Sequence, residues 1–336
     1  MILKSRFFAG KTLIHEIMIE SEANSFQQIT IDKVIADFLF HCQYEKNLNG
    51  KTIYAYRSDL QMFEKYMRNS YSSFLFEQVS KDMLKGYLRH IATYKPKTVK
   101  RKLASLKALF NYYDYEHDDF LNPFRKLHIR FKEPYVLPTV MTGDEVKTIL
   151  KYLYKLRTDN PNTGNYMYKA QTRDIAVVEL LFATGIRVSE LCELTCNAVD
   201  LKQATIKVFG KGSKERVIQI CSAEVLEILK QYEQLFAPSE YFFVNRLGNR
   251  LSPQSVRILI RRCKEETGLE KKISPHTFRH TFATLLLEED VDIKYIQNLL
   301  GHSSITTTQI YTHVNMNKQK ALLSSKHPRK KMDLEG

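Results

Sequence analysis

Cysteines are few in this sequence, and they follow none of the patterns that mark a disulfide framework or a zinc site. There are five in 336 residues, an odd number, and no two are spaced as C-x2-C. Two of them stand four residues apart in an apparent helix, without the second pair that a zinc site would need. We expect reduced, mostly buried thiols in a cytoplasmic protein. The five are Cys42, Cys192, Cys196, Cys221 and Cys263.

Long apolar runs are also missing. No segment approaches the roughly 18 apolar residues that a membrane-spanning helix needs, so we expect no membrane partner. The basic start, Met1–Ile19, has neither an unbroken apolar core nor a small-residue cleavage site, which argues against a secretory signal. It is interpreted as an added arm, with Met18 as an alternative translation start. The sequence shows no internal repeat and no low-complexity segment.

Basic residues are in clear excess over acidic ones. The formal net charge is +14 and the pI is about 9.4. Such an excess favours a nucleic-acid partner, because Lys and Arg neutralise phosphates and release counterions. The alternatives are a ribosome-associated protein and a basic surface without a specific partner. The length favours two domains, and 43% hydrophobic residues can fill ordinary cores.

Residues 30–116 have the apolar spacing of an all-helical domain. The spacing predicts four helices, of which the last is capped by Thr98 and carries its apolar stripe through Tyr113. Basic residues crowd the start and polar face of this last helix. They are interpreted as either a DNA-facing stripe or a solvated face. The DNA-contact candidates in this domain are Arg57, Lys97, Lys100, Arg101, Lys102 and Lys107.

A basic, proline-containing stretch separates this region from the rest. Asn122-Pro123 ends the helices, and the basic stretch from Lys126 to Pro138 is predicted to be extended, within a linker over residues 123–138. Thr142, with Glu145 three residues later, predicts a capping box and a new helix. We place the domain boundary near residue 133.

The second domain is predicted to mix helices with a small β-sheet. A helix is expected over Thr172–Thr184, and β-rich runs cover Ala204–Phe209 and Glu215–Cys221. Residues 210–214 join the two runs as a hairpin turn. A third short strand is expected at Tyr241–Val244. After Pro253 the chain is predicted to be mainly helical.

Four short segments of this domain carry candidate chemistry, and the first surrounds Arg187. It follows a glycine turn, where its guanidinium can donate two hydrogen bonds to a phosphate. Glu190, one helical turn later, is expected to orient it. The alternative is an ordinary surface salt bridge.

The second segment puts Lys211 between two glycines at the hairpin tip. An ammonium there can enter a groove or protonate a leaving alkoxide, although lysines are also common in tight turns. Lys214 and Arg216 follow closely and are further DNA-contact candidates.

The third segment has His276 and Arg279 three residues apart on a helix that starts near Ser274-Pro275. This spacing delivers an imidazole and a guanidinium to one phosphate. A zinc site with His280 is rejected, because the H-E-x-x-H glutamate is absent and Arg279 would repel the metal. His280 is interpreted as a buried, hydrogen-bonded histidine.

The fourth segment ends at Tyr311, nine residues after His302. A free tyrosine, with a pKa near 10, is a poor nucleophile until it is activated. Neighbouring arginines stabilise both the phenolate and a five-coordinate phosphorus. Alone, Tyr311 would be interpreted as a packing residue; the combination makes it a candidate nucleophile.

Together these segments closely resemble the tyrosine recombinase (phage integrase) family, in particular its Xer branch. They read TGIRVSEL from Thr184, FGKGSKERVIQI from Phe209, SPHTFRHTFATLLL from Ser274 and LGHSSITTTQIYTHV from Leu300. They follow the family's order and cover most of residues 140–315. The helical N-terminal region is similar to the family's core-binding domain, and the His-Pro-Arg at 327–329 resembles the Xer ending.

The resemblance implies a role for each matching residue. Tyr311 would attack the scissile phosphate and form a 3′-phosphotyrosyl link. Arg187 and Arg279 would clamp that phosphate, and Lys211 would be the general acid for the 5′-oxygen leaving group.

The resemblance also assigns the histidines. His276 would assist proton transfer with Tyr311, and His302 would hydrogen-bond the phosphate in the transition state. Glu190 and His280 are expected to support the site. No metal and no nucleotide cofactor are implied, because the phosphotyrosine ester conserves the bond energy.

The implied architecture is a two-domain, C-shaped DNA clamp, mainly α-helical, with an α+β catalytic domain carrying a small sheet. The SAM-like core-binding domain is expected to be all-helical. The first 28 residues and a loop at 159–165 look extra beside a compact Xer protein. The expected limits are 1–28 for an N-terminal extension, 29–122 for the core-binding domain, 123–138 for the linker, 139–315 for the catalytic domain and 316–336 for a basic tail.

The implied partners are double-stranded DNA with paired half-sites and three further copies of the chain. They would form a tetrameric synapse at the nucleoid, with residues 316–336 docking on a neighbour, and a second recombinase or accessory protein is a further candidate partner. Two biological roles stay open, Xer-type dimer resolution and integration or excision of a mobile element. The alternative functions are a type IB topoisomerase and a catalytically silent DNA-binding regulator.

Overall fold

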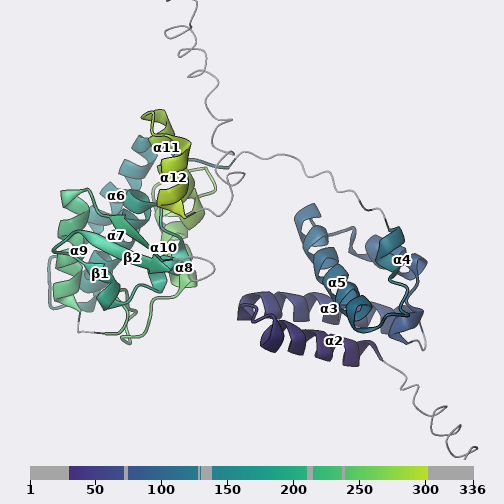
Figure 1. Cartoon of the computed structure of the whole chain (residues 1–336). Coiled ribbons are helices and arrows are strands. Elements are labelled where there is room, and N and C mark those ends of the chain that lie inside the picture. The colour runs from purple at the N-terminus through teal and green to yellow at the C-terminus, as the bar shows by residue number, and fades with distance from the viewer. Residues whose placement is uncertain are drawn as a thin grey trace, which may run out of the picture. The chain divides into compact units, whose positions relative to one another are not determined.

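The computed structural model describes residues 30–71, 75–127, 129, 138–209, 215–236 and 239–301. They belong to two compact units, which divide between Tyr135 and Val136 (Figure 1). Lys211, Lys214, His302 and Tyr311, together with the predicted N-terminal extension and basic tail, lie outside the described residues.

The first unit is helical around an aromatic core. α3 and α5 pack against each other, and α2 packs on both. Side chains of Phe63, Phe76 and Phe110 are fully buried between the helices. The helices are α2 (Ile31–Phe40), α3 (Gly50–Ser70), α4 (Lys81–Ile91) and α5 (Pro96–Glu116), with a π-helical turn at His41–Glu45 and 3-10 turns at Phe76–Gln78 and Pro123–Lys126.

Local chemistry sets most of these helix starts, with two departures from the sequence-based expectations. α3 begins after Asn49, whose side chain accepts a hydrogen bond from the Lys51 N–H at 2.9 Å. α5 begins at Pro96 rather than after Thr98, because proline fits the first helical turn. Residues Pro123–Lys126 form a 3-10 turn, so the extended stretch expected from Lys126 does not begin at that residue, and Phe124 packs on the Phe110 ring at 5.3 Å between centroids.

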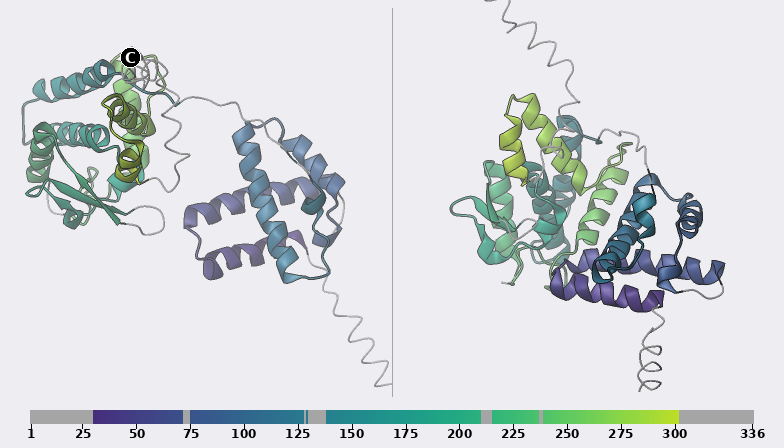
Figure 2. Two further views of the ribbon diagram at one scale, coloured as in Figure 1. Left: turned by 45° about the horizontal axis from the view of Figure 1, so that its top comes forward. Right: turned by 45° about the vertical axis from the view of Figure 1, so that its right-hand side comes forward.

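The second unit surrounds α7, a helix whose carboxyl-terminal half is largely buried. α7 contacts α6, α9 and α11, so it forms the centre of the fold (Figures 1 and 2). The helices are α6 (Gly143–Thr158), α7 (Tyr166–Thr184), α8 (Val188–Cys192), α9 (Ala223–Leu235), α10 (Pro253–Glu266), α11 (Pro275–Glu288) and α12 (Ile293–Leu300).

A three-stranded antiparallel sheet of order β1-β2-β3 completes this unit. The strands are β1 (Val199–Asp200), β2 (Thr205–Phe209) and β3 (Glu215–Gln219). Phe209 lies opposite Glu215, so β2 and β3 pair on either side of residues 210–214. The expected strand at Tyr241–Val244 is wrong: only isolated bridges form there, from Tyr241 to Thr195 and from Val244 to Arg250.

The predicted fold class, mainly helical with a small β-sheet, is confirmed. α7 starts at Tyr166, six residues before the expected Thr172, because the Asn165 side chain caps it. Three cysteines are buried, whereas Cys196 and Cys221 are exposed. Among the described helices, none is long and apolar enough to cross a membrane. The described residues contain no His, Cys, Asp and Glu group suited to a metal ion.

Candidate active site

The candidate site begins where α7 ends. Gly185 has a φ of +60°, a left-handed conformation that glycine adopts without strain. Arg187 is the N-cap of α8, and Glu190 in its first turn folds back on it. The Glu190 carboxylate accepts the Arg187 main-chain N–H at 3.0 Å and the guanidinium Nη1 at 2.7 Å. The predicted orienting contact between these two residues is present.

Glu190 also binds a second guanidinium, that of Arg216 on β3. Arg216 Nη1 and Nη2 donate to the two carboxylate oxygens of Glu190 at 3.0 and 2.7 Å. Burial alone raises the pKa of Glu190, but the hydrogen bonds from Arg216 and Arg187 outweigh it and hold that pKa below its usual value. Glu190 is therefore a buried carboxylate that stays ionised at neutral pH.

Three arginines meet at the carboxyl end of α12. The carbonyl of Leu299 accepts from Arg216 Nε at 3.2 Å, and that of Leu300 from Arg279 Nη2 at 2.6 Å. The carbonyl of Gly301 accepts from Arg187 Nη2 at 3.1 Å. These carbonyls carry the negative end of the helix dipole, so cations are favoured there.

Arg279 also ties α11 to the turn before α8. Its side chain is buried, and Nη1 donates to the Gly185 carbonyl at 2.7 Å. Arg187 and Arg279, far apart in the sequence, thus reach adjacent carbonyls at one point. Each guanidinium carries five N–H donors, so a carbonyl contact does not use up its capacity to bind an anion.

His276 lies in the first turn of α11, one turn before Arg279. It is exposed at the surface, yet nearby protein displaces enough water to lower its pKa. The positive charges of Arg279, Arg257 and Arg187 lower it further. His280 is more enclosed, and burial, followed by the charges of His276 and Arg279, lowers its pKa to about 4. Both imidazoles are therefore neutral at neutral pH.

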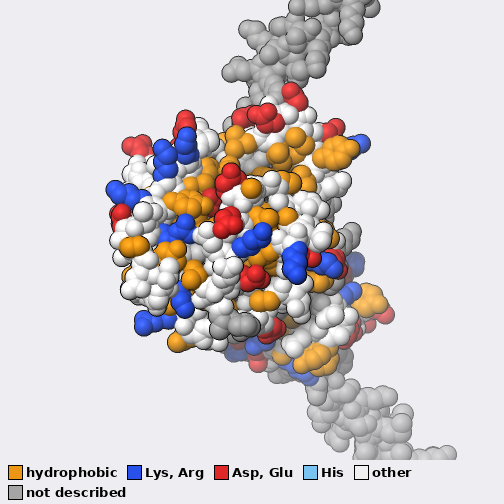
Figure 3. Space-filling model, turned by 90° about the vertical axis from the view of Figure 1, so that its left-hand side faces the viewer, with side chains coloured by type: hydrophobic (Ala, Val, Ile, Leu, Met, Phe, Trp, Pro, Cys, Tyr) orange, Lys and Arg blue, Asp and Glu red, His pale blue; other side chains and the backbone are white. Residues whose placement is uncertain are grey.

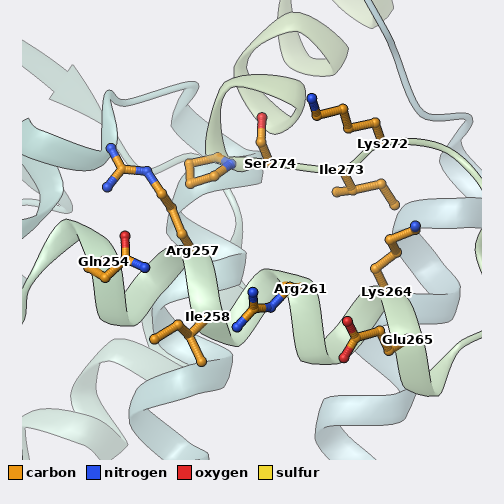
Figure 4. Close-up of a pocket in the computed structure, with 10 residues that line it drawn as sticks. Gln254, Arg257, Ile258, Arg261, Lys264, Glu265, Lys272, Ile273 and Ser274 are labelled. Carbon is orange, nitrogen blue, oxygen red and sulfur yellow. The ribbon is translucent and has the colours of Figure 1, made fainter.

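A basic groove of about 420 Å³ lies next to His276, between α10 and the segment that leads into α11. Figure 4 shows Arg257, Arg261 and Lys264 along α10, with Lys272 across from them. Glu265 is the acidic residue among the ten that line the groove. The groove therefore favours an anion.

The first unit exposes most of its DNA-contact candidates. Arg57, Lys97, Lys100, Arg101 and Lys107 are exposed residues of α3 and α5. Lys102 is not: its side chain is 4% exposed, and Nζ binds Asp59 at 3.2 Å. The expectation that Lys102 lies on an open, DNA-facing stripe is wrong, because its ammonium pairs with the buried carboxylate of Asp59 on α3.

Arg216 is also placed differently from its expected role as a DNA contact. Its side chain is only 14% exposed and faces Glu190 and the end of α12. On the face of the second unit seen in Figure 3, basic and acidic side chains are interspersed. Positive charge is therefore not uniform over this unit.

Comparison with known proteins now decides the family. The model of the phage integrase family matches residues 139–318, and that of the phage integrase N-terminal SAM-like domain matches residues 35–116. A tyrosine recombinase from Agathobacter rectalis is 46% identical over 300 residues, covering 88% of this chain and 96% of the relative. The chain belongs to the phage integrase family of tyrosine recombinases. The predicted enzyme class is confirmed.

Other members of this family match over similar lengths. Tyrosine recombinase XerC of Thermodesulfovibrio yellowstonii is 35% identical and covers 89% of this chain and 97% of the relative. A XerH recombinase structure, bound to its palindromic difH substrate, has a TM-score of 0.69 at 23% identity, covering 90% of this chain and 91% of that one. A lambda integrase dimer bound to a core site has a TM-score of 0.65 at 19% identity, covering 87% and 80%. These structures support the fold.

The sequence reasoning missed the α10 groove. The signal was available, because Gln254, Arg257, Arg261 and Lys264 recur every three or four residues and so share a helix face. This pattern resembles an ordinary solvated face, and only the apposition of Lys272 makes it a groove.

Proposed function

We propose that the chain is a site-specific DNA recombinase that cuts and rejoins DNA through a 3′-phosphotyrosyl intermediate and a Holliday junction. The observation that carries the proposal is the convergence of Arg187 and Arg279 at the end of α12. The chain continues from there directly into the segment with His302 and Tyr311. Two converging guanidiniums, followed ten residues after Gly301 by a candidate tyrosine nucleophile, suit attack on a phosphodiester.

The chemistry assigns one step to each group. The Tyr311 oxygen forms a bond to phosphorus, and the bond from phosphorus to the 5′-oxygen breaks. Lys211 gives a proton to the departing 5′-oxygen, and neutral His276 accepts the proton of Tyr311. Attack by a 5′-hydroxyl on the phosphotyrosine reverses these steps, so religation needs no nucleotide cofactor.

The remaining groups stabilise the charge that develops on the phosphate. Arg187 and Arg279 donate N–H groups to the non-bridging oxygens, and His302 adds another donor. Glu190 is ionised and holds the Arg187 guanidinium at 2.7 Å. Fixing that guanidinium before DNA arrives lowers the reorganisation that the reaction requires.

The DNA surface of the proposal includes both units. Exposed Arg57, Lys97 and Lys107 on the first unit and the α10 groove on the second supply positive charge. We propose that the two units close on a duplex as a C-shaped clamp with the domain limits expected from the sequence. The site of action would be the nucleoid in the cytoplasm.

The assembly proposed is a tetramer on paired half-sites, with residues 316–336 docking on a neighbouring protomer. A lambda integrase tetramer bound to a Holliday junction has the same fold, with a TM-score of 0.65. Relatives named XerC and XerD favour dimer resolution as the biological role. A gene found inside a mobile element, beside an excision factor, would instead assign integration or excision.

The decisive experiment uses a nicked suicide duplex that carries the target half-sites found by footprinting on genomic DNA. The wild-type chain should become covalently attached to this DNA, and Tyr311→Phe should form no adduct. Arg187→Ala should slow adduct formation by about 10²–10³-fold, as loss of one donor to a developing anion does elsewhere. An adduct that survives in Tyr311→Phe removes this tyrosine as the nucleophile.

Two further outcomes separate the alternatives. Efficient relaxation of plasmids that lack any target, without strand exchange, would identify a type IB topoisomerase. Tight duplex binding by the wild-type chain with no adduct at all would identify a silent DNA-binding regulator.

A further inference from the structure

We propose that Arg216 is a positioning residue of the strand-transfer reaction, which fixes Arg187 and the end of α12 relative to β3 without contacting DNA. This inference rests on the proposed function. It changes the expectation from the sequence, in which Arg216 was a DNA contact next to Lys211.

The hydrogen bonds of Arg216 are directed inward. Each of its three nitrogens donates to a protein acceptor, two to the Glu190 carboxylate and one to the Leu299 carbonyl. Its side chain is 14% exposed, against 30% for Arg187. The Arg187 side chain is therefore more accessible to solvent. In Arg216, by contrast, all three nitrogens of the planar guanidinium group donate to protein acceptors.

Glu190 links the two arginines. Arg187 Nη1 and Arg216 Nη1 both donate to Oε1, while the Arg187 N–H and Arg216 Nη2 donate to Oε2. A carboxylate held on both oxygens by one guanidinium has little freedom to rotate. The Arg187 guanidinium binds the same carboxylate and is therefore held in a fixed position. In this way Arg216 acts on Arg187 through Glu190.

Arg216 also joins three segments that the proposed reaction needs. It is the second residue of β3, and it contacts both the start of α8 and the end of α12. Gly301 shows how close this contact is. A Cβ on Gly301 would lie 3.0 Å from Arg216 Nη1 and 3.2 Å from its Cδ and Cζ.

Loss of Arg216 should therefore slow the chemical step rather than weaken DNA binding. Without Arg216, the side chain that connects both Glu190, the partner of Arg187, and the end of α12 to β3 is lost. A displacement of about 1 Å in a reacting geometry can cost about 10²-fold in rate. The number of phosphates neutralised does not change, so the salt dependence of DNA affinity should stay the same.

The test compares Arg216→Lys and Arg216→Gln with the full-length wild-type chain. Single-turnover cleavage of the nicked suicide duplex gives the rate at saturating protein, and titration at several salt concentrations gives the affinity and its salt slope. We expect cleavage to slow about 10–100-fold with an unchanged salt slope. Lysine should not rescue, because one ammonium cannot span two carboxylate oxygens and a carbonyl.

Arg173 provides a matched control on the same unit. Its side chain is 13% exposed, and it donates to the Asp174 carboxylate and the Val244 carbonyl. Arg173→Lys should lower thermal stability as Arg216→Lys does, while leaving the cleavage rate near that of the wild type. Equal slowing in both variants would mean that Arg216 has only a structural role.

A double-mutant cycle with Arg187→Lys tests the connection through Glu190. Positioning predicts that the second substitution costs much less once the first is present. Additive losses would overturn the inference, because the two arginines would then act independently. A salt slope reduced by about one would also overturn it and would make Arg216 a DNA contact. A wild-type chain without adduct overturns the proposed function and this inference with it, whereas a wild-type adduct with unaffected Arg216 variants overturns this inference alone.

Discussion

At the scale of single residues, two histidines one helical turn apart on α11 have different surroundings. Loss of surrounding water is the main cause that lowers the pKa of both, and the charges of Arg279, Arg257 and Arg187 add to it at His276. His280 is more enclosed, and its pKa falls further, to about 4. A neutral His276 suits a proton acceptor for a tyrosine. An enclosed, neutral His280 instead makes the folded state sensitive to acid.

We predict that His280 contributes to the loss of stability in mild acid. Its pKa in the folded chain lies below the unfolded value of about 6.5, so the unfolded state binds the proton first as pH falls. The contribution is intact above about pH 6.5 and is lost progressively toward pH 4, by about 2 kcal/mol between pH 7.5 and pH 5. Calorimetry of wild type and His280→Gln at both pH values should show a smaller drop in Tm for the variant. Equal drops would contradict this account.

At the scale of elements, the junction of α7, α11 and α12 depends on one glycine. A Cβ on Gly185 would lie 2.6 Å from Phe282 Cδ1 on α11 and 2.8 Å from Leu300 Cδ2 on α12. Because Gly185 also has a φ of +60°, alanine would be both strained and overpacked. The same glycine presents its carbonyl to Arg279, so packing and the phosphate clamp are coupled.

We predict that Gly185→Ala destabilises the second unit by roughly 2–4 kcal/mol, from left-handed strain plus overpacking. Gly248→Ala is the control, since its φ is +76° but nothing lies within 4 Å of the added Cβ. It should cost only about 1–2 kcal/mol. Thermal unfolding of both variants measures the difference, and similar Tm losses would show that the contacts with Phe282 and Leu300 yield easily.

A second element-scale contact joins α3 to α5 in the first unit. The buried Asp59 carboxylate accepts hydrogen bonds from Lys102 at 3.2 Å and from Ser105 at 2.8 Å, and it also pairs with Arg101. Lys102 is itself buried. A buried ammonium whose counter-charge is removed is strongly destabilising.

We predict that Asp59→Asn lowers the stability of the first unit by about 3–5 kcal/mol. Asp59→Asn combined with Lys102→Met should recover much of that loss, because no unpaired charge then remains buried. Asp82→Asn is the control, as Asp82 pairs with Lys85 on an exposed helix face, and it should leave Tm unchanged. Failure of the double variant to recover would show that Asp59 acts mainly through Arg101 and Ser105.

Local signals in the sequence were enough to predict much of the fold. The apolar spacing predicted the helices of the first unit, and the pairing of β2 with β3 agrees with a hairpin through residues 210–214. The pairing of Arg187 with Glu190 spans three residues and could also be predicted. Contacts over long separations could not: Arg216 reaches Glu190 26 residues away, and Lys102 reaches Asp59 43 residues away. No periodic pattern records such contacts, so both basic residues were assigned to the surface.

At the scale of the whole molecule, the net charge of +14 is the property that the proposed function uses. Counterion release makes DNA affinity fall with salt in proportion to the phosphates neutralised. If both units hold one duplex, basic residues from each should contribute to a single salt slope. If only one unit binds the duplex, substitutions of basic residues in the other unit should leave the salt slope unchanged.

We therefore predict that Lys97→Ala on α5 and Arg261→Ala on α10 each reduce the slope of log affinity against log salt by about one, and that together they reduce it by about two. Lys230→Ala is the control, because this exposed lysine lies on α9, which packs on α7 and does not line the groove. It should leave the slope unchanged. Affinity for a duplex half-site, measured by fluorescence anisotropy from low to moderate salt, checks all four proteins. An effect confined to Lys97→Ala would mean that the α10 groove does not face the DNA, and one confined to Arg261→Ala would mean that the α5 stripe is an ordinary solvated face.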